Sequence, residues 1–516
     1  MASPAAASVQ REALPRHGRR IAIEIDTFGA NCVHICAHMK EAHHVHGYPA
    51  FRPTGMTGPT AGTVPALELD DIQGTVLRRR PDDYHGVYLL YRIDDPAATK
   101  RSLREVLPKI TSAADWELPR PYTLNVAFTY RGLARLGVPE DSLASFSEEF
   151  RAGMAARKEV LGDLGANDPG NWLPPLGGAD VHIGVMIIAR APEGLREPVD
   201  AAGRLAGVNL VYRLDVGVPV TGREHFGFRD GISSPHLLGS TDAPLPGQDS
   251  VQPGEFLFGY PDESGTPPPG PAPEVLGRNG CYLAFRQMHA DVAAFRRYLR
   301  DNASSPEAEE LLAAKFVGRW RSGAPLALAP DHDDPELGAD PMRNNDFRYH
   351  EDPRGLRVPR GAHIRRANPR DGLTDTVVAV NIHRVLRRGA AYGPPLPDGI
   401  LEDDGAERGI IFVFLGASLS RQFEFVQQVW LNDGDFAGLG AERDPLIGDN
   451  DGTGVHTVPA TPVRRRLTGL PRFVTVRGGE YCFLPGLTAL KWLTTLPDTA
   501  AKPATTPPTS MPESDR

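Results

Sequence analysis

The alternation of short apolar strands with helical segments constrains the fold of this chain more than any other feature of its sequence. In the first half, apolar residues alternate over short runs typical of strands, and the longer segments between these runs have helical spacing. The predicted strands are 87–93, 123–128, 181–189 and 210–214, and the predicted helices are 99–110, 131–136, 141–158 and 192–206. Strands separated by one or two helices predict a sheet with helices on one face.

The second half repeats this order. Residues 410–415 form a continuous apolar run typical of a buried strand, and Phe423, Val426 and Trp430 share one face of a helix predicted over 421–431. Further strands are predicted at 281–285 and 377–385, a helix at 288–299, and a hairpin of 473–476 and 480–483 about Gly478 and Gly479. The chain is therefore predicted to be an α+β protein with two domains, each an antiparallel sheet with helices packed on one face.

Composition limits the possible partners and the extent of the domains. The chain has 516 residues and a formal net charge of −9, so nucleic acid is not expected as a partner, and no apolar run is long enough to cross a bilayer. Residues 1–65 and 498–516 are predicted to be a disordered extension and a disordered tail. A Cys- and His-rich stretch at 32–46 has no zinc-ligand spacing, so metal binding there is the weaker interpretation.

Two features favour a cytoplasmic protein. The arginines of RHGRR, residues 16–20, resemble an export signal, but Glu24 and Asp26 follow where such a signal has an uncharged apolar region. The four cysteines form no recognisable disulfide framework, which agrees with a reducing compartment.

Three stretches carry residues suited to chemistry on a metal cofactor. His363 lies in GAHIRRANPR, where an imidazole can bind a metal, although a histidine in a basic surface turn is the commoner explanation. GFRDG, residues 227–231, places Asp230 in a glycine-framed turn, and VLRRGAAYGP supplies Arg387. A histidine, a rigidly held carboxylate and an arginine are the parts that a haem peroxidase requires.

The chain resembles the longer members of the dye-decolorising peroxidase family over most of its length. The motifs that carry the resemblance are DIQGTVL, EHFGFRDGISSP, GRNGCYLAFRQ, AHIRRANPR, ASLSRQFEFVQQVW, FVTVRGGEY and EYCFLPGLTAL, in this order. The resemblance implies two ferredoxin-like domains, predicted here at 66–225 and 226–497, with one haem b (iron protoporphyrin IX) per chain held mainly by the second. It also implies hydrogen peroxide and an aromatic reductant as substrates, and leaves the oligomeric state open.

The same resemblance implies roles for particular residues. Asp230 becomes the acid/base that moves a proton of peroxide, and His363 the ligand of the iron. Arg387 becomes the charge that stabilises O–O cleavage, with Arg384 and Arg388 as competing choices. For the remaining positions, Glu424 is expected to accept the other ring N–H of His363, and Arg365 and Arg366 to pair with the haem propionates.

The sequence departs from the family pattern at Val358, where many relatives have cysteine, and at Ala390-Ala391, where relatives often have Ile-Pro. The second change leaves the backbone after Arg387 with more freedom. Two other functions stay open, a haem carrier or sensor and a haem-modifying enzyme of the chlorite dismutase superfamily. A carrier has no use for Asp230 and Arg387, and the haem-modifying relatives lack the GxxDG loop.

Overall fold

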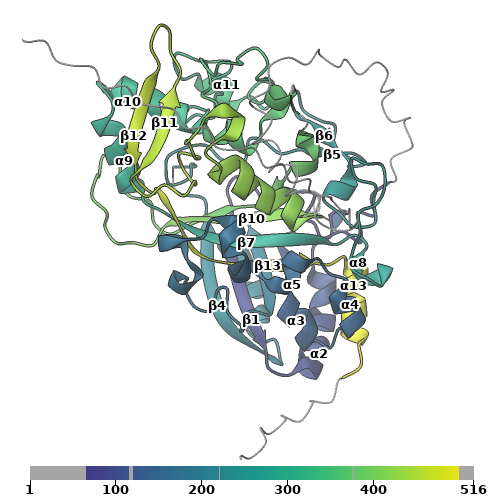
Figure 1. Cartoon of the computed structure of the whole chain (residues 1–516). Coiled ribbons are helices and arrows are strands. Elements are labelled where there is room, and N and C mark those ends of the chain that lie inside the picture. The colour runs from purple at the N-terminus through teal and green to yellow at the C-terminus, as the bar shows by residue number, and fades with distance from the viewer. Residues whose placement is uncertain (1–65, 116–119, 220, 375, 377, 499–516) are drawn as a thin grey trace, which may run out of the picture. The chain divides into compact units, whose positions relative to one another are not determined.

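The computed structural model describes residues 66–498 except 116–119, 220, 375 and 377. The predictions of disorder at 1–65 and 499–516, and the Cys- and His-rich stretch at 32–46, lie outside these residues. Within the described part, no helix combines the length and apolarity needed to cross a membrane. Figure 1 shows the described elements with their labels.

The first half folds into four antiparallel strands in the order β4-β1-β3-β2. Their bounds are β1 His85–Ile93, β2 Tyr122–Thr129, β3 Ile183–Ala189 and β4 Val208–Gly217. Two helices, α2 (Pro96–Val106) and α7 (Glu193–Ala202), cross between β1 and β2 and between β3 and β4. Asp95 caps α2 because its carboxylate accepts the N–H groups of Ala97 and Ala98. This strand order and connection define a ferredoxin-like sheet.

The second half has the same arrangement, with its strands in the order β13-β7-β10-β8. The strands are β7 Cys281–Ala290, β8 Leu386–Arg387, β9 Ala390–Tyr392, β10 Gly409–Gly416 and β13 Val474–Leu484. Two smaller pairs stand apart from this sheet, β5 (His236–Leu237) with β6 (Ser250–Val251) and β11 (Gly454–Val458) with β12 (Arg465–Leu470). The α+β class with two ferredoxin-like sheets is therefore confirmed. The boundary near residue 225 lies between the strands of the two halves and remains a prediction.

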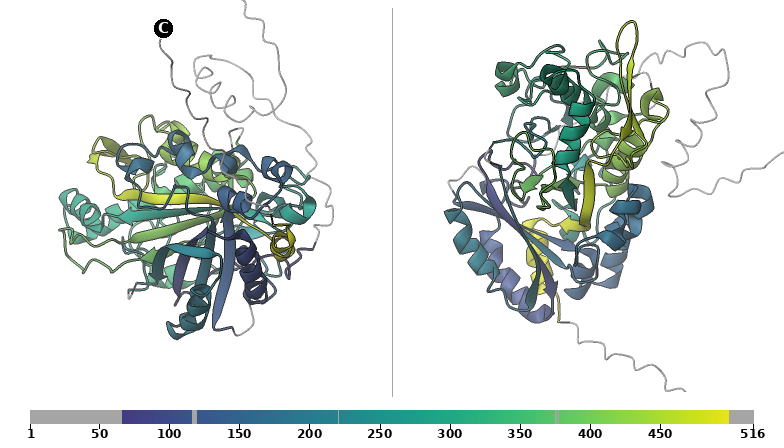
Figure 2. Two further views of the ribbon diagram at one scale, coloured as in Figure 1. Left: turned by 90° about the horizontal axis from the view of Figure 1, so that it is seen from below. Right: turned by 90° about the vertical axis from the view of Figure 1, so that its left-hand side faces the viewer.

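Helices and short helical turns connect and cover the strands. The remaining helices are α3 Tyr130–Arg135, α4 Glu140–Ala144, α5 Glu148–Ala152, α6 Lys158–Leu161, α8 Glu274–Gly277, α9 Val292–Asp301, α10 Pro306–Val317, α11 Pro335–Ala339, α12 His363–Ala367 and α13 Leu487–Thr495. Two wide-turned π-helical segments follow β10, η10 (Leu419–Glu424) and η11 (Val426–Asn432). Figure 2 shows long twisted strands between these outer helices.

The two half-sheets join into one sheet of nine strands, because β2 pairs with β13 at Thr129–Cys482 and Phe128–Phe483. The face that carries Tyr88 and Leu90 packs against the corresponding face of the second half, where Phe285 lies 5.5 Å from Tyr88 between ring centroids. Helices cover the opposite face. One hydrophobic core therefore lies between these two sheet faces, and a second, larger one lies between the sheet and the helices.

The motif DIQGTVL crosses the join between the two halves. Gln73 donates to the carbonyls of Val126 and Pro485 and accepts the N–H of Val126. Asp71 accepts hydrogen bonds from Asn279 and from the N–H of Thr488. Because the first, third and last motifs of the chain meet here, their polar residues serve to hold the two half-sheets together.

Three local predictions are wrong. Residues 377–385 form no strand in their described part, because Val380–His383 is a 3-10 turn. The predicted hairpin is one strand, β13, in which Gly478 and Gly479 sit at an irregularity of pairing with β7. A side chain at Gly479 would meet Met154 and the Phe285 carbonyl, so the glycines permit close packing here and make no turn. Residues 141–158 form several short helical pieces, and no single helix.

Candidate functional site

The loop that carries Asp230 is held by a buried carboxylate. Glu224 accepts the N–H groups of Phe226 and Phe228, and burial raises its pKa to about 7. The N–H of Arg229 then donates to the carbonyl of Arg321, which fixes the loop one residue before the aspartate. Asp230 itself keeps 42% of its side chain exposed, and a Cβ at Gly231 would meet no atom within 4 Å. A rigid loop thus presents a carboxylate to open space.

Arg387 reaches the same space from strand β8. Its side chain is exposed, and its Nη2 donates to the carbonyl of Ser233, 3.0 Å away and three residues after Asp230. The two competing arginines are buried. Arg384 pairs with Asp249, and Arg388 donates to the carbonyls of Thr75 and Val76 at 2.6 Å each. Their guanidinium groups bind other parts of the protein, so Arg387 is the accessible one of the three competing arginines.

Two arginines that the sequence did not single out also border this space. Arg79 donates to the carbonyl of Gly231 at 2.6 Å, and Arg80 pairs with Asp230 at 3.5 Å. Burial and the nearby charge of Arg387 lower the pKa of Arg79, although its side chain remains open to solvent. Arg79, Arg80 and Arg387 thus all reach the loop at residues 230–233, and these three arginines and Asp230 are called the Asp230 cluster below.

His363 is the first residue of α12, and its ring is fixed by a buried aspartate. Its Nδ1 lies 2.9 Å from Oδ2 of Asp444, while Oδ1 of Asp444 accepts the N–H groups of Leu446 and Ile447. Burial acts to raise the pKa of Asp444, but His363, Ile447 N–H and Arg366 together hold it below its usual range. An ionised carboxylate on Nδ1 leaves Nε2 as the lone-pair nitrogen for a metal. Among the described residues, no hydrogen bond involves Nε2.

The expectation for Glu424 is wrong, because this residue has other partners. Its carboxylate binds Arg157 in a bidentate pair at 2.9 and 2.8 Å and accepts the hydroxyl of Tyr481 at 3.0 Å. Its helix, η10, directs it toward the first half of the chain. The carboxylate beside His363 is Asp444, a residue that no sequence motif marks.

The expectation for Arg365 and Arg366 is also wrong. Both side chains are buried, and their donors bind groups of the protein. Arg366 donates to the carbonyls of Trp430, Glu442 and Asp433 at 2.6 to 2.8 Å, and Arg365 binds Asp352 and the carbonyl of Val358. Guanidinium groups occupied in this way anchor the helix of His363 and are not directed toward a cofactor carboxylate.

Two further histidines near the site are buried as neutral groups. His383 stacks on Phe425 with ring centroids 3.7 Å apart, and burial lowers its pKa to about 4. His225 contacts the carbonyl of Tyr392 through Nε2, and burial lowers its pKa too. Neither replaces Asp230 as an accessible base.

The segment after α10 connects the His363 side of the site with the Asp230 side. Ile364, next to His363, packs closely on Gly318, and Arg321 of the same segment binds the Asp230 loop. Burial lowers the pKa of Arg319 to about 9, with contributions from the charges of Arg370 and Arg387. Residues 318–321 therefore contact both the helix of His363 and the loop of Asp230.

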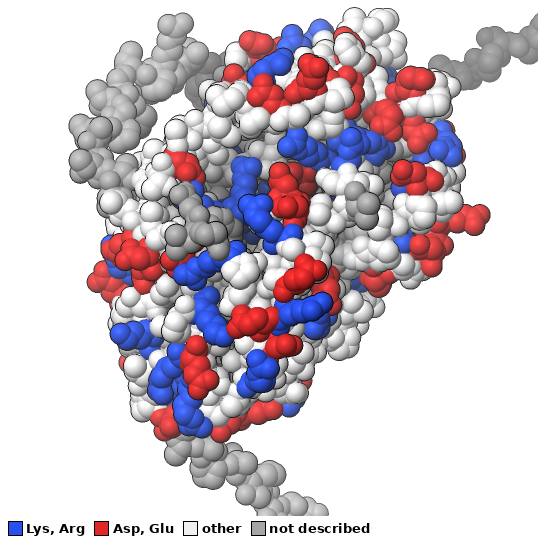
Figure 3. All heavy atoms as spheres, turned by 180° about the vertical axis from the view of Figure 1, so that it is seen from behind, with Lys and Arg blue, Asp and Glu red and all other residues white. Residues whose placement is uncertain are grey.

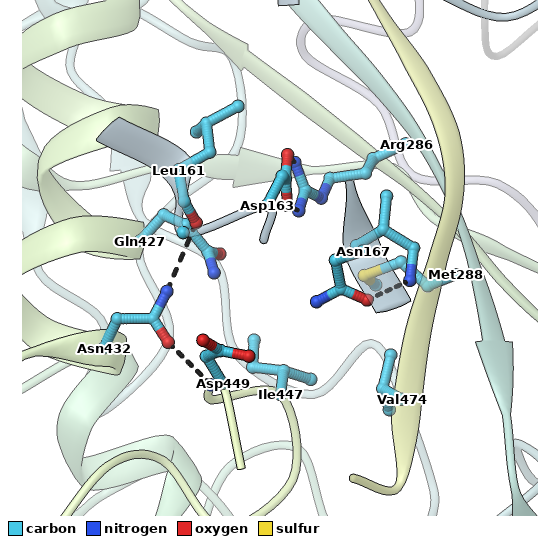
Figure 4. Close-up of a pocket in the computed structure, with 12 residues that line it drawn as sticks. Leu161, Asp163, Asn167, Arg286, Met288, Gln427, Asn432, Ile447, Asp449 and Val474 are labelled. Carbon is cyan, nitrogen blue, oxygen red and sulfur yellow. Dashed lines mark hydrogen bonds and ion pairs between the residues drawn. The ribbon is translucent and has the colours of Figure 1, made fainter. Parts of the chain in front are cut away.

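A polar pocket adjoins the loop of Asp444, because Ile447, whose N–H donates to Asp444, is among its lining residues. It is lined by Asp163, Arg286, Asn167, Asn432 and Asp449 among others, and Figure 4 shows their side chains turned toward one another. Asp163 and Arg286 form a buried ion pair, and Asn432 binds Leu161 and Asp449 through the backbone. Because these polar groups bind one another across the two halves, they help to hold the halves together.

The chemistry of these residues fits a haem. An imidazole whose other nitrogen binds a carboxylate is suited to ligating iron, and His363 with Asp444 has this form. An accessible carboxylate and a guanidinium are suited to peroxide, and Asp230 and Arg387 are such groups. No cluster of three His, Cys, Asp or Glu residues suited to a metal ion is found in the described part of the chain.

Comparison with known proteins identifies the family of this chain. Residues 71–201 match the family model of the DyP dimeric alpha+beta barrel domain. The chain is 33% identical over 471 residues to a dye-decolorizing peroxidase of Mycena epipterygia, covering 82% of this chain and 86% of that one. It is 32% identical over 467 residues to the dye-decolorizing peroxidase AauDyP1 of Auricularia auricula-judae, covering 84% and 88%.

A solved structure of a dye-decolorizing peroxidase in complex with 2,6-dimethoxyphenol is similar throughout. It has 31% sequence identity and a TM-score of 0.75, and the match covers 83% of this chain and 100% of that one. The chain belongs to the dye-decolorizing peroxidase family. It is a haem peroxidase, and haem is its cofactor.

Proposed function

We propose that this enzyme reduces hydrogen peroxide to water and oxidises dye-like or phenolic aromatic donors. In this proposal Asp230 is the acid/base, Arg387 stabilises the charge that develops as the O–O bond breaks, and His363 ligates iron with Asp444 on its other nitrogen. The overall reaction consumes one peroxide, two electrons and two protons and releases two water molecules. When bound, the haem would supply the two electrons that reduce peroxide, and the aromatic donor would replace them.

The chain's own contribution is to move one proton and to place one charge. A carboxylate oxygen of Asp230 can take the proton from one peroxide oxygen and return it to the leaving oxygen, so that water departs. Arg387 binds the same loop three residues after Asp230, and its guanidinium is suited to stabilising negative charge on the leaving oxygen. One observation carries the proposal: Arg387 is exposed and binds the loop of the exposed Asp230 at Ser233, while the competing arginines, Arg384 and Arg388, are buried.

Stopped-flow mixing with peroxide tests these two roles without any donor. Asp230→Asn keeps the size of the side chain but removes the base, so the change in the haem absorption band should slow by about 10²- to 10⁴-fold. Arg387→Leu should slow it by about 10²- to 10³-fold. Asp242→Asn is the matched control for a carboxylate, since Asp242 is an exposed carboxylate that pairs with Arg78. An unchanged rate in Asp230→Asn would show that the GFRDG loop only shapes the pocket.

The iron ligand is tested by haem titration. His363→Ala should lose stable haem binding, whereas His332→Ala, which changes an exposed histidine of the same half, should bind haem as the parent does. Full occupancy with an unchanged spectrum in His363→Ala would assign the iron to another residue.

The donor class rests on the relatives. A similar structure contains 2,6-dimethoxyphenol, and several relatives are named for dye decolorisation. Steady-state oxidation of 2,6-dimethoxyphenol and of an anthraquinone dye by the haem-loaded enzyme would support the proposal. Turnover of neither, with normal reaction toward peroxide, would restrict the enzyme to another donor.

Surface charge and cysteine chemistry support the remaining parts of the proposal. On the face in Figure 3, acidic and basic side chains are interspersed, which suits small donors better than a nucleic acid. Cys281 and Cys482 are buried free thiols, which agrees with the proposed cytoplasmic location. Cell fractionation with an antibody to the native protein tests the location.

A further inference from the structure

The segment 77–81 leads from the join between the half-sheets to the loop of Asp230. Arg388 holds its beginning, because its guanidinium donates to the carbonyls of Thr75 and Val76. Arg79 and Arg80 then extend toward the Asp230 loop. This segment precedes the first strand of the chain, yet it contacts residues of the second half.

Arg80 is fixed at three points. Its Nε donates to the carbonyl of Gly389 at 2.6 Å, two residues after Arg387. Its guanidinium lies over the ring of Tyr84, 4.1 Å from the centroid. Its Nη2 is the atom that faces Asp230 Oδ2 at 3.5 Å. A stacked guanidinium with one donor already bound has little freedom left to lose when its other end meets a carboxylate.

Tyr84 in turn is attached to the strand beyond Arg387. The N–H of Ala391 donates to the Tyr84 hydroxyl at 2.7 Å, and the tyrosine side chain is almost fully buried. A proline at position 391 would have no N–H to donate. The alanine in this chain therefore provides the anchor on which Arg80 is stacked.

We propose that Arg80 is a positioning residue for peroxide cleavage, which ties the Asp230 carboxylate to the strand that carries Arg387. The proposal rests on the function assigned above to Asp230 and goes beyond it. Arg80 bridges the two elements of the site, since one end binds the turn after Arg387 and the other binds Asp230. Its charge also attracts the carboxylate and so limits the directions in which Asp230 can point.

The first test removes the bridge and leaves the rest of the segment intact. In Arg80→Leu, the second-order rate of the haem spectral change with peroxide should fall by about 2- to 5-fold, as expected for the loss of a partly exposed ion pair at 3.5 Å. Arg78→Leu is the matched control, because Arg78 belongs to the same segment and binds Asp242 and Thr241. The control should react at the parent rate. Equal rates for Arg80→Leu and the parent would overturn the proposal.

The second test separates a positioning role from a general loss of structure. Arg80→Lys keeps the charge, so it should recover at least half of the lost rate on a logarithmic scale. Cyanide affinity should follow the same order, because hydrogen cyanide must give up a proton to a base when it binds iron as the anion. If Arg80→Lys is as slow as Arg80→Leu while both hold haem fully, the charge of Arg80 is not what acts, and the proposal fails.

A double-mutant cycle distinguishes this proposal from the one on which it rests. In an Asp230→Asn background, Arg80→Leu should have almost no further effect, since the carboxylate through which it acts is gone. Independent, multiplicative losses would overturn the role of Arg80 and leave that of Asp230 intact. A silent Asp230→Asn would overturn the role of Asp230 itself, whatever Arg80→Leu does.

Discussion

Replacing Asp444 by asparagine should disable His363 as an iron ligand through its tautomer. Oδ1 of Asp444 accepts two backbone N–H groups, from Leu446 and Ile447, so in Asp444→Asn the amide oxygen must occupy this position. The amide NH₂ then faces Nδ1 of His363. As a donor it requires a lone pair on Nδ1, which places the ring proton on Nε2, the nitrogen that iron needs.

The size of the effect follows from this geometry. The ring must either lose the hydrogen bond at 2.9 Å or lose a proton when iron binds. Comparable changes to the hydrogen-bond partners of metal ligands cost about 10- to 100-fold in affinity, which corresponds to about 1.4 to 2.7 kcal/mol. Loss of the buried negative charge also makes the imidazole a weaker donor, so the reduction potential of the haem iron should rise.

Haem titration of the apoprotein and spectroelectrochemistry of the loaded enzyme measure both effects. Asp449→Asn is the control, since Asp449 lies on the same loop but pairs with Arg472. The control should leave affinity and potential unchanged. An Asp444→Asn variant with the parent's affinity and potential would refute the tautomer argument, and with it the role of Asp444 behind His363.

Three further predictions concern buried ionisable side chains outside the Asp230 cluster. Burial raises the pKa of Glu480 from 4.5 to about 8, so the folded state binds its proton more tightly than the unfolded state. The free energy of unfolding should therefore fall as pH rises from about 4.5 to 8. Melting curves of Glu480→Gln should show a smaller decline over this range, and an identical pH dependence would contradict the assignment. Asp163→Asn should cost about 3 to 5 kcal/mol in urea denaturation because it leaves the Arg286 charge buried and unpaired, and a loss below about 1 kcal/mol would show that the pair is solvated. Arg366→Met should destabilise the apoprotein by at least about 1 to 3 kcal/mol because three carbonyls lose their donor; a stable apoprotein with weakened haem binding would instead restore the propionate role.

The class of fold and the residues in tight motifs could be predicted from the sequence, because both depend on local patterns. Strand periodicity located β1, β2, β3 and β10 within a few residues, and glycines around Asp230 marked a loop that is rigid in the structure. The hairpin at Gly478 and Gly479 failed for a physical reason. Paired glycines are equally suited to a turn and to close packing between strands, and only the neighbours at 154 and 176 decide between them.

Partners across the chain could not be predicted. Asp444 lies 81 residues after His363, and neither its spacing nor its neighbours distinguish it from other acidic loop residues. Arg366 and Arg387 are both arginines in basic runs, yet Arg366 is buried among carbonyls and Arg387 is exposed beside the Asp230 loop. Such differences depend on which way each element faces, and a sequence pattern of two or three residues carries no information on this.

The position of β13 has a consequence for how the protein is made. This strand is the last of the sheet along the chain, yet it lies in the middle, between β2 and β7. Until the ribosome has released residues 474–484, two inner strand edges remain open and the halves have no seam. Exposed edges of this kind pair readily with other chains. We therefore expect the nascent protein to depend on chaperones, or on rapid completion of synthesis, more than a chain whose domains close one after the other.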